Sequence, residues 1–109
     1  MEKKYKLRQS AREDIKKIGR YTLKKYGMAK RNEYLLGLES QFESIAEMPL
    51  KARQRNDIRE GYYSSSYKRH VIFFCIHNEY IEIMGVLHKR MLPEGHLLPD
   101  SISRVSLVA

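Results

Sequence analysis

Histidines and arginines in the second half of the chain are the residues whose chemistry points to a site. His70 opens an apolar run, His88 and Arg90 follow the end of another, and His96 comes shortly after them. Metal-independent RNA cleavage needs a base for the 2′-hydroxyl, an acid for the leaving oxygen and cations for the phosphate, and His with Arg or Lys fills all three roles. These four residues are therefore a candidate ribonuclease site.

The same strand end also has a simpler interpretation. His88 follows an apolar strand and caps it by hydrogen bonding, while Lys89 and Arg90 form a solvated strand end. Under the catalytic alternative, Arg69 or Lys89 would hold phosphate, with Arg59 and Lys68 in reach. The composition leaves both alternatives open.

Other kinds of site lack their motifs. The histidines form no paired short-range spacing and Cys75 is the single cysteine, so no metal site is expected. The sequence has no nucleophile elbow and no phosphate-cradling glycine loop. No cofactor is expected either.

Two apolar runs must position the histidines. They span residues 70–76 and 80–87, and the polar stretch 77–79 separates them, as in a β-hairpin. The first run is nearly continuous in apolarity, which predicts a strand covered on both faces. The second alternates at Ile81, Glu82 and Ile83, which predicts one wetter face.

The N-terminal half predicts a short strand and then a helix. Tyr5 and Leu7 alternate with basic residues, as in a half-buried strand. Ser10 opens the helix, and Glu13 three residues later completes a capping box. Gly27 is the expected terminator.

A second helix is expected from about Ala29 to Met48, with Pro49 ending it. Its apolar stripe faces the rest of the domain. The stripe consists of Tyr34, Leu35, Leu38, Phe42, Ile45 and Met48.

The remaining segments connect these elements. Residues 50–57 are predicted to be a polar connection, 58–63 a short strand and 64–66 its turn. A helical hairpin cannot bury both its stripes alone, so the strands supply the missing surface. The fold class is α+β: an N-terminal strand, an antiparallel helical hairpin and a small, mainly antiparallel sheet. One domain spans residues 1–97, and 98–109 form a C-terminal tail.

The net charge of +8 is concentrated in one half. Residues 1–55 carry 15 Lys and Arg against 7 Asp and Glu, whereas residues 56–109 carry 6 against 6. This asymmetry predicts an acidic partner, either nucleic acid or an acidic protein segment. The lone Cys75, the missing secretory signal and the absence of a membrane-length apolar run predict a cytoplasmic protein without membrane contact.

Several motifs in their order along the chain resemble the ParE toxins of the RelE/ParE toxin–antitoxin superfamily, between about Tyr5 and Leu97. His70 stands where RelE-like chains carry an arginine, which favours ParE. Gly85 and Leu92 depart from the ParE pattern, where a basic and an acidic residue are usual. The motifs are residues 10–15, the pairs Tyr21-Thr22 and Tyr26-Gly27, Phe42 with Pro49, and residues 58–62, 70–74 and 87–91.

The resemblance implies a toxin of a type II toxin–antitoxin system that inhibits DNA gyrase and blocks replication. It also implies a cognate, ParD-like antitoxin that wraps and neutralises the toxin in a hetero-oligomer. The alternative within the superfamily is a ribonuclease of RelE type that cuts messenger RNA. Under the gyrase hypothesis no residue is catalytic, and the expected partner-binding residues are Arg59, Arg69, His88, Lys89, Arg90 and Met91.

Overall fold

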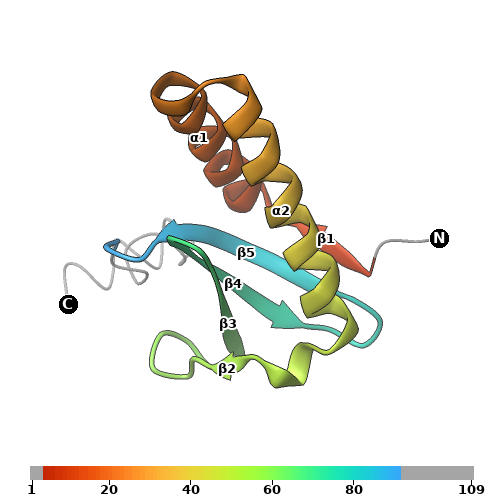
Figure 1. Ribbon diagram of the computed structural model, residues 1–109. Coiled ribbons are helices and arrows are strands. Elements are labelled where there is room, and N and C mark those ends of the chain that lie inside the picture. The colour runs from red at the N-terminus through yellow and green to blue at the C-terminus, as the bar shows by residue number, and fades with distance from the viewer. Residues whose placement is uncertain (1–3, 92–109) are drawn as a thin grey trace.

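The computed structural model describes residues 4–91, in which a helical hairpin packs on one face of a five-stranded sheet (Figure 1). The sheet order is β1-β5-β4-β3-β2, with β1 parallel to β5 and the other pairs antiparallel. The predicted α+β layout is confirmed, including the return of the first strand beside a later one. The elements are β1 (Tyr5–Leu7), α1 (Gln9–Tyr26), α2 (Met28–Glu47), a 3₁₀ turn (Pro49–Lys51), β2 (Arg53–Gln54), β3 (Tyr62–Tyr67), β4 (His70–Ile76) and β5 (Ile81–His88).

The hairpin forms as its sequence predicts, except at its last residue. Gly27 joins the helices with φ of 93°, a left-handed conformation that favours glycine, and its N–H donates to the Leu23 carbonyl. Met48, expected in the buried stripe, is 55% exposed. The helix ends at Glu47, and Met48 has φ of −140°, so its side chain no longer follows the helical stripe.

The predicted capping box at the start of α1 is wrong. Arg8 is the N-cap residue and offers no side-chain hydrogen bond to the helix, so the helix begins before Ser10. The Ser10 hydroxyl instead donates to the Met84 carbonyl oxygen at 2.7 Å. One turn later, the buried carboxylate of Asp14 accepts a hydrogen bond from the Val86 N–H at 3.0 Å.

These two contacts hold a β-bulge in β5. The ladder pairs Phe73 with Gly85 but Phe74 with Ile83, so Met84 is the extra residue. Because side chains alternate along a strand, one extra residue reverses which face the following side chains occupy. The bulge therefore turns Val86 and His88 toward the helices, and α1 hydrogen-bonds the Met84 carbonyl and the Val86 N–H beside it.

Apolar side chains cover both faces of the central strands. The larger cluster, which includes Phe42, Phe74 and Ile83, fills the space between helices and sheet. On the opposite face Tyr62, Phe73, Met84 and Leu87 are each at most 5% exposed. The prediction that β4 is covered on both faces is confirmed. The prediction that β5 has one solvent-exposed face is wrong beyond Glu82, because the bulge places Met84 and Leu87 in the second cluster.

The strand and turn predicted over residues 58–66 are shifted. The serines lie within β3, and the chain reverses at Lys68 and Arg69, where Lys68 has φ of 51°. Ser64 is buried and accepts from the Arg55 guanidinium at 3.4 Å, while Ser65 accepts from the Gln41 amide at 3.2 Å. These distant partners satisfy hydroxyls that would otherwise favour a turn.

Candidate functional site

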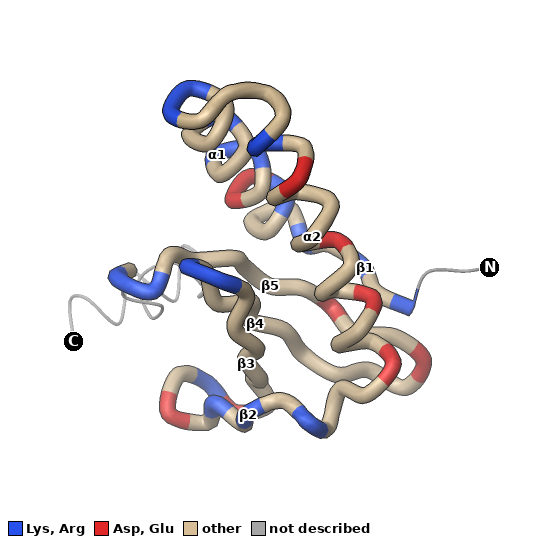
Figure 2. The backbone as a smooth tube through the Cα atoms, viewed as in Figure 1, with Lys and Arg blue, Asp and Glu red and all other residues tan. Residues whose placement is uncertain are grey.

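A groove opens between the helical hairpin and the sheet end formed by the β3–β4 turn and the last residue of β5. Its volume is about 540 Å³, within the range of ligand sites. Figure 2 shows Lys and Arg gathered at the hairpin tip and at this end of the sheet. We call it the histidine groove; its lining is Lys17, Ile18, Tyr21, Thr22, Tyr26, Lys30, Glu33 and Tyr34 from the helices, and Lys68, Arg69, His70 and His88 from the sheet.

Two histidines form the floor of this groove. His70 begins β4 and His88 ends β5, and the ladder places them directly opposite each other. Their ring centroids lie 5.6 Å apart, with an interplanar angle of 81°. The β4–β5 hairpin thus brings together two histidines that are 18 residues apart in the sequence. The bulge at Met84 turns His88 to the groove side.

Tyr34 fixes the ring of His70. Its hydroxyl lies 2.6 Å from His70 Nδ1, and the rings meet edge to face. Burial raises the pKa of Tyr34, followed by the nearby Tyr67, and a hydrogen bond from the Arg69 backbone partly opposes this rise. The hydroxyl therefore keeps its proton at neutral pH and shares a hydrogen bond with His70 Nδ1.

His88 is held in one tautomer. The Arg90 backbone N–H donates to His88 Nδ1 at 3.2 Å, so in the neutral imidazole the proton sits on Nε2. The Nδ1 atom of His70 is occupied by the Tyr34 hydroxyl. The His88 ring therefore presents an N–H donor rather than a lone pair, which suits an anion better than proton abstraction.

Acid is expected to destabilise the fold through His70. Burial, and then the charge on His88, lower the pKa of His70 below its ordinary value of 6.5. Because the unfolded state then binds the proton more readily, the stabilisation is complete above about pH 6.5 and is lost as the pH falls toward the lowered pKa. The free-energy difference between wild type and His70→Gln, measured by urea unfolding, should shrink between pH 7.5 and 5. Equal differences at both pH values would contradict this account.

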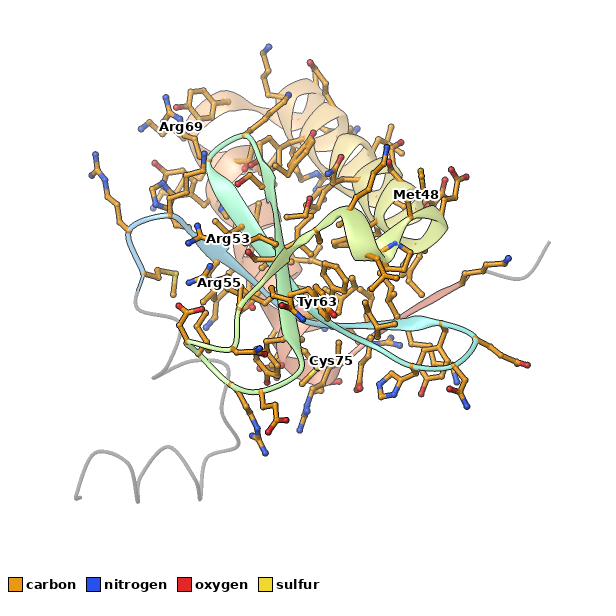
Figure 3. All side chains as sticks on the ribbon, turned by 90° about the horizontal axis from the view of Figure 1, so that it is seen from below. Met48, Arg53, Arg55, Tyr63, Arg69 and Cys75 are labelled. Atoms are coloured by element: carbon orange, nitrogen blue, oxygen red, sulfur yellow. The ribbon has the colours of Figure 1, made fainter. Side chains whose placement is uncertain are left out.

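The structure brings some predicted site residues together and separates another. Arg69 lines the histidine groove with His70 and His88, and Lys89 follows them, its N–H donating to the Arg69 carbonyl at 3.1 Å. Arg90 and Met91 continue from this strand end, where both are exposed. Figure 3 shows Arg69 at the opposite end of β4 from Cys75.

Arg59 lies away from this group. Its charge acts on Tyr62 and Cys75, which belong to the sheet face turned away from the helices. Cys75 is half-buried there, and burial raises the pKa of its thiol. His96 and the tail 98–109 lie outside the described residues.

The sequence-based prediction missed the helical wall of the groove. Tyr34 was assigned to an apolar stripe, and Tyr21 and Tyr26 appeared only as motif residues. Their rings are half or more exposed at positions 21 and 26, and Lys17 and Lys30 stand beside them. Three tyrosines spaced along two adjoining helices are the signal from which this wall could have been found.

A second groove runs between the two helices. Its floor is apolar, with Ile15, Leu23 and Leu35, and its volume is about 400 Å³. Ile15 and Leu35 also line a further depression that continues along β1. We call this the hairpin groove; its lining is Ile15, Lys16, Gly19, Arg20, Leu23, Arg31 and Leu35.

Residues 4–91 lack the features of two other kinds of protein, metal-binding and membrane-spanning ones. No three side chains of His, Cys, Asp or Glu in this part of the chain cluster closely enough to hold a metal ion. Neither helix there has the length and apolarity that crossing a membrane requires.

Comparisons with known proteins agree with this geometry. The sequence pattern of the family described as "ParE toxin of type II toxin-antitoxin system, parDE" matches residues 5–93. The chain belongs to the ParE toxin family. It is 30% identical over 95 residues to Toxin ParE1 of Caulobacter vibrioides, covering 87% of this chain and 98% of that protein. Toxin ParE1 of Mycobacterium tuberculosis is 29% identical over 92 residues, covering 84% and 94% respectively.

The fold of this ParE toxin also has a solved counterpart. A chain of the chromosomal ParDE toxin–antitoxin system from P. aeruginosa superimposes with a TM-score of 0.68 and 14% identity, covering 77% of this chain and 92% of that one. The predicted family and its fold are confirmed. The protein is thus the toxin of a type II toxin–antitoxin system, and an antitoxin is its partner.

Proposed function

We propose that this ParE toxin inhibits DNA gyrase by binding to it, and that it breaks no covalent bond itself. The observation that supports binding over catalysis is the tautomer of His88. His88 uses its Nδ1 lone pair to accept the Arg90 N–H, so its Nε2 holds a proton and offers no base. The family's action on gyrase supplies the target, and the proposal places the toxin in the cytoplasm with its target.

The gyrase contact is assigned to the strand end that leads out of the sheet. Lys89, Arg90 and Met91 are exposed there, and Met91 adds an apolar side chain that is 45% exposed. Arg69 and His88 adjoin them through the backbone bonds of the same turn. Arg59 is omitted from this surface because it belongs to the opposite sheet face. Residues 1–97 are taken as the toxin domain and 98–109 as its tail.

The antitoxin is assigned to the hairpin groove. An amphipathic segment with acidic residues fits an apolar floor rimmed by Lys16, Arg20 and Arg31. Such a segment would order on binding and cover the hairpin, which accounts for the basic charge of the N-terminal half.

Leu23→Glu is expected to weaken antitoxin binding by roughly tenfold or more, because it places a charge on the groove floor facing an acidic partner. Leu36→Glu is the matched control, since Leu36 is 66% exposed on α2 and does not line the groove. Binding of each purified toxin to its cognate antitoxin is measured by calorimetry. Equal losses in both variants would place the antitoxin elsewhere.

One observation favours the alternative of an RNA-cleaving enzyme: His70 and His88 lie face to face beside Lys68 and Arg69. If the pair were catalytic, replacing both histidines with alanine would reduce RNA cleavage by roughly 10² to 10⁴. We expect instead that His70→Ala combined with His88→Ala retains part of its gyrase inhibition, measured by plasmid supercoiling. Complete loss of a cleavage activity present in the wild type would establish the enzyme.

A further inference from the structure

The histidine groove has exposed aromatic walls that lie outside the packed core. Tyr21 and Tyr26 line it and remain 60% and 52% exposed. Neither belongs to either core cluster of the described residues. Exposed rings beside a concave surface are platforms on which flat aromatic groups stack.

The groove also concentrates positive charge. Four of its described lining residues are Lys or Arg and one is an acid, Glu33, which lies 3.7 Å from Lys30. Lys68 is fixed by its position in the tight β3–β4 turn, and its ammonium group lies 5.6 Å from the centre of the Tyr34 ring. Arg69 follows it, and a guanidinium and an ammonium group together suit a phosphate.

The tautomer of His88 adds a donor to these cations. Because its Nδ1 accepts the Arg90 N–H, its Nε2–H is left for a ligand. A metal ion at Nε2 would need a lone pair there. The groove therefore favours an anion over a cation.

We propose that the histidine groove binds a nucleotide, with its phosphate at Lys68 and Arg69 and its base stacked on Tyr21 and Tyr26. The volume of about 540 Å³ accommodates a ligand of this size. The nucleotide is either a free molecule or one unit of a single strand. This site adjoins the proposed gyrase surface and shares Arg69 and His88 with it. Binding there involves no bond cleavage.

The test is a calorimetric titration of the full-length chain with AMP, adenosine and inorganic phosphate at low salt. We expect AMP to bind, and adenosine and phosphate each to bind roughly tenfold more weakly, because each supplies only half of the contacts. Lys68→Gln with Arg69→Gln should weaken AMP binding by roughly tenfold. Tyr21→Ala should weaken it by roughly fivefold or more, the loss of one stacked base.

The matched control is Lys51→Gln with Arg53→Gln, which removes the same charge from exposed positions outside the groove. It should bind AMP as the wild type does. An equal loss in this control, or no loss in the Lys68 and Arg69 variant, would overturn the proposal, because nonspecific charge would then explain binding.

A short single-stranded oligonucleotide distinguishes the two sources of the nucleotide. Affinity well above that of AMP identifies a strand, and equal affinity identifies the free molecule. Binding of a glutamate-rich peptide without binding of AMP or the oligonucleotide would make the groove a protein-docking surface and refute the nucleotide site.

Discussion

Replacing Asp14 with alanine is expected to destabilise the toxin by about 1–3 kcal/mol, because the buried Val86 N–H loses its acceptor. For a domain of this size, each kcal/mol corresponds to a fall in melting temperature of roughly 4–8 °C. Urea unfolding and calorimetry measure both quantities. This loss of unfolding free energy would be large for the substitution of a single helix residue outside the candidate site.

Two further variants test the parts of this contact separately. One removes the charge of Asp14 but keeps an acceptor for the Val86 N–H, and the other removes the second hydrogen bond between α1 and β5. Asp14→Asn keeps an acceptor oxygen and should recover much of the stability. Ser10→Ala removes the donor to Met84 and should cost about 0.5–1.5 kcal/mol. If Asp14→Ala were as stable as the wild type, the bulge would not depend on α1, and the explanation of how His88 reaches the groove would fail.

Reversing the charge of Lys89 and Arg90 together should reduce gyrase inhibition by roughly tenfold or more. Both side chains are exposed beyond β5, so the change leaves the core intact and acts on partner binding. Charges at the rim of an interface increase the association rate, and contacts at its centre slow dissociation. Inhibition is measured as the toxin concentration that halves plasmid supercoiling. The fold of the variant is verified by circular dichroism.

Lys51→Glu with Arg53→Glu is the matched control for this prediction. It reverses two exposed charges in the 3₁₀ turn and in β2, outside the proposed gyrase contact, and should leave the inhibitory concentration unchanged. If both double variants lose equal potency, net charge and not the strand end determines gyrase binding. If neither loses potency, the gyrase contact lies elsewhere on the toxin.

The fold was predictable wherever local patterns agree with the final structure. The β4–β5 hairpin follows from two β-branched and aromatic runs around a polar turn. The helices follow from their apolar periodicity and from Gly27. These signals lie within about 20 residues of each other, so no distant partner is needed to interpret them.

The errors arise where a partner outside the element decides the local structure. Ser64 and Ser65 have turn-forming side chains, yet Arg55 and Gln41 satisfy them inside a strand. Ser10 fits a capping box, yet its hydroxyl donates to Met84, 74 residues away. The bulge that it supports adjoins Gly85, and a glycine within a strand is the one local signal of a bulge in β5.

The residues of the candidate site that the hairpin joins could be predicted from the sequence, and those that tertiary packing adds could not. His70, His88 and Arg69 meet because the hairpin joins them, and the sequence predicted that hairpin. Tyr34 reaches the pair only through the packing of α2 on the sheet. The position of Arg59 in the sequence suggested that it lies near the histidines. Arg59 instead stands in the loop before β3, which carries it to the opposite face of the sheet.

Gyrase binding by this toxin is tested most directly with purified toxin, freed from its antitoxin, in two parallel assays. One measures plasmid supercoiling by gyrase, and the other measures cleavage of messenger RNA in a translating extract. We predict loss of supercoiling with intact RNA. Cleaved RNA with normal supercoiling would contradict gyrase binding, and His70, His88 and Arg90 would then have to be treated as an active site.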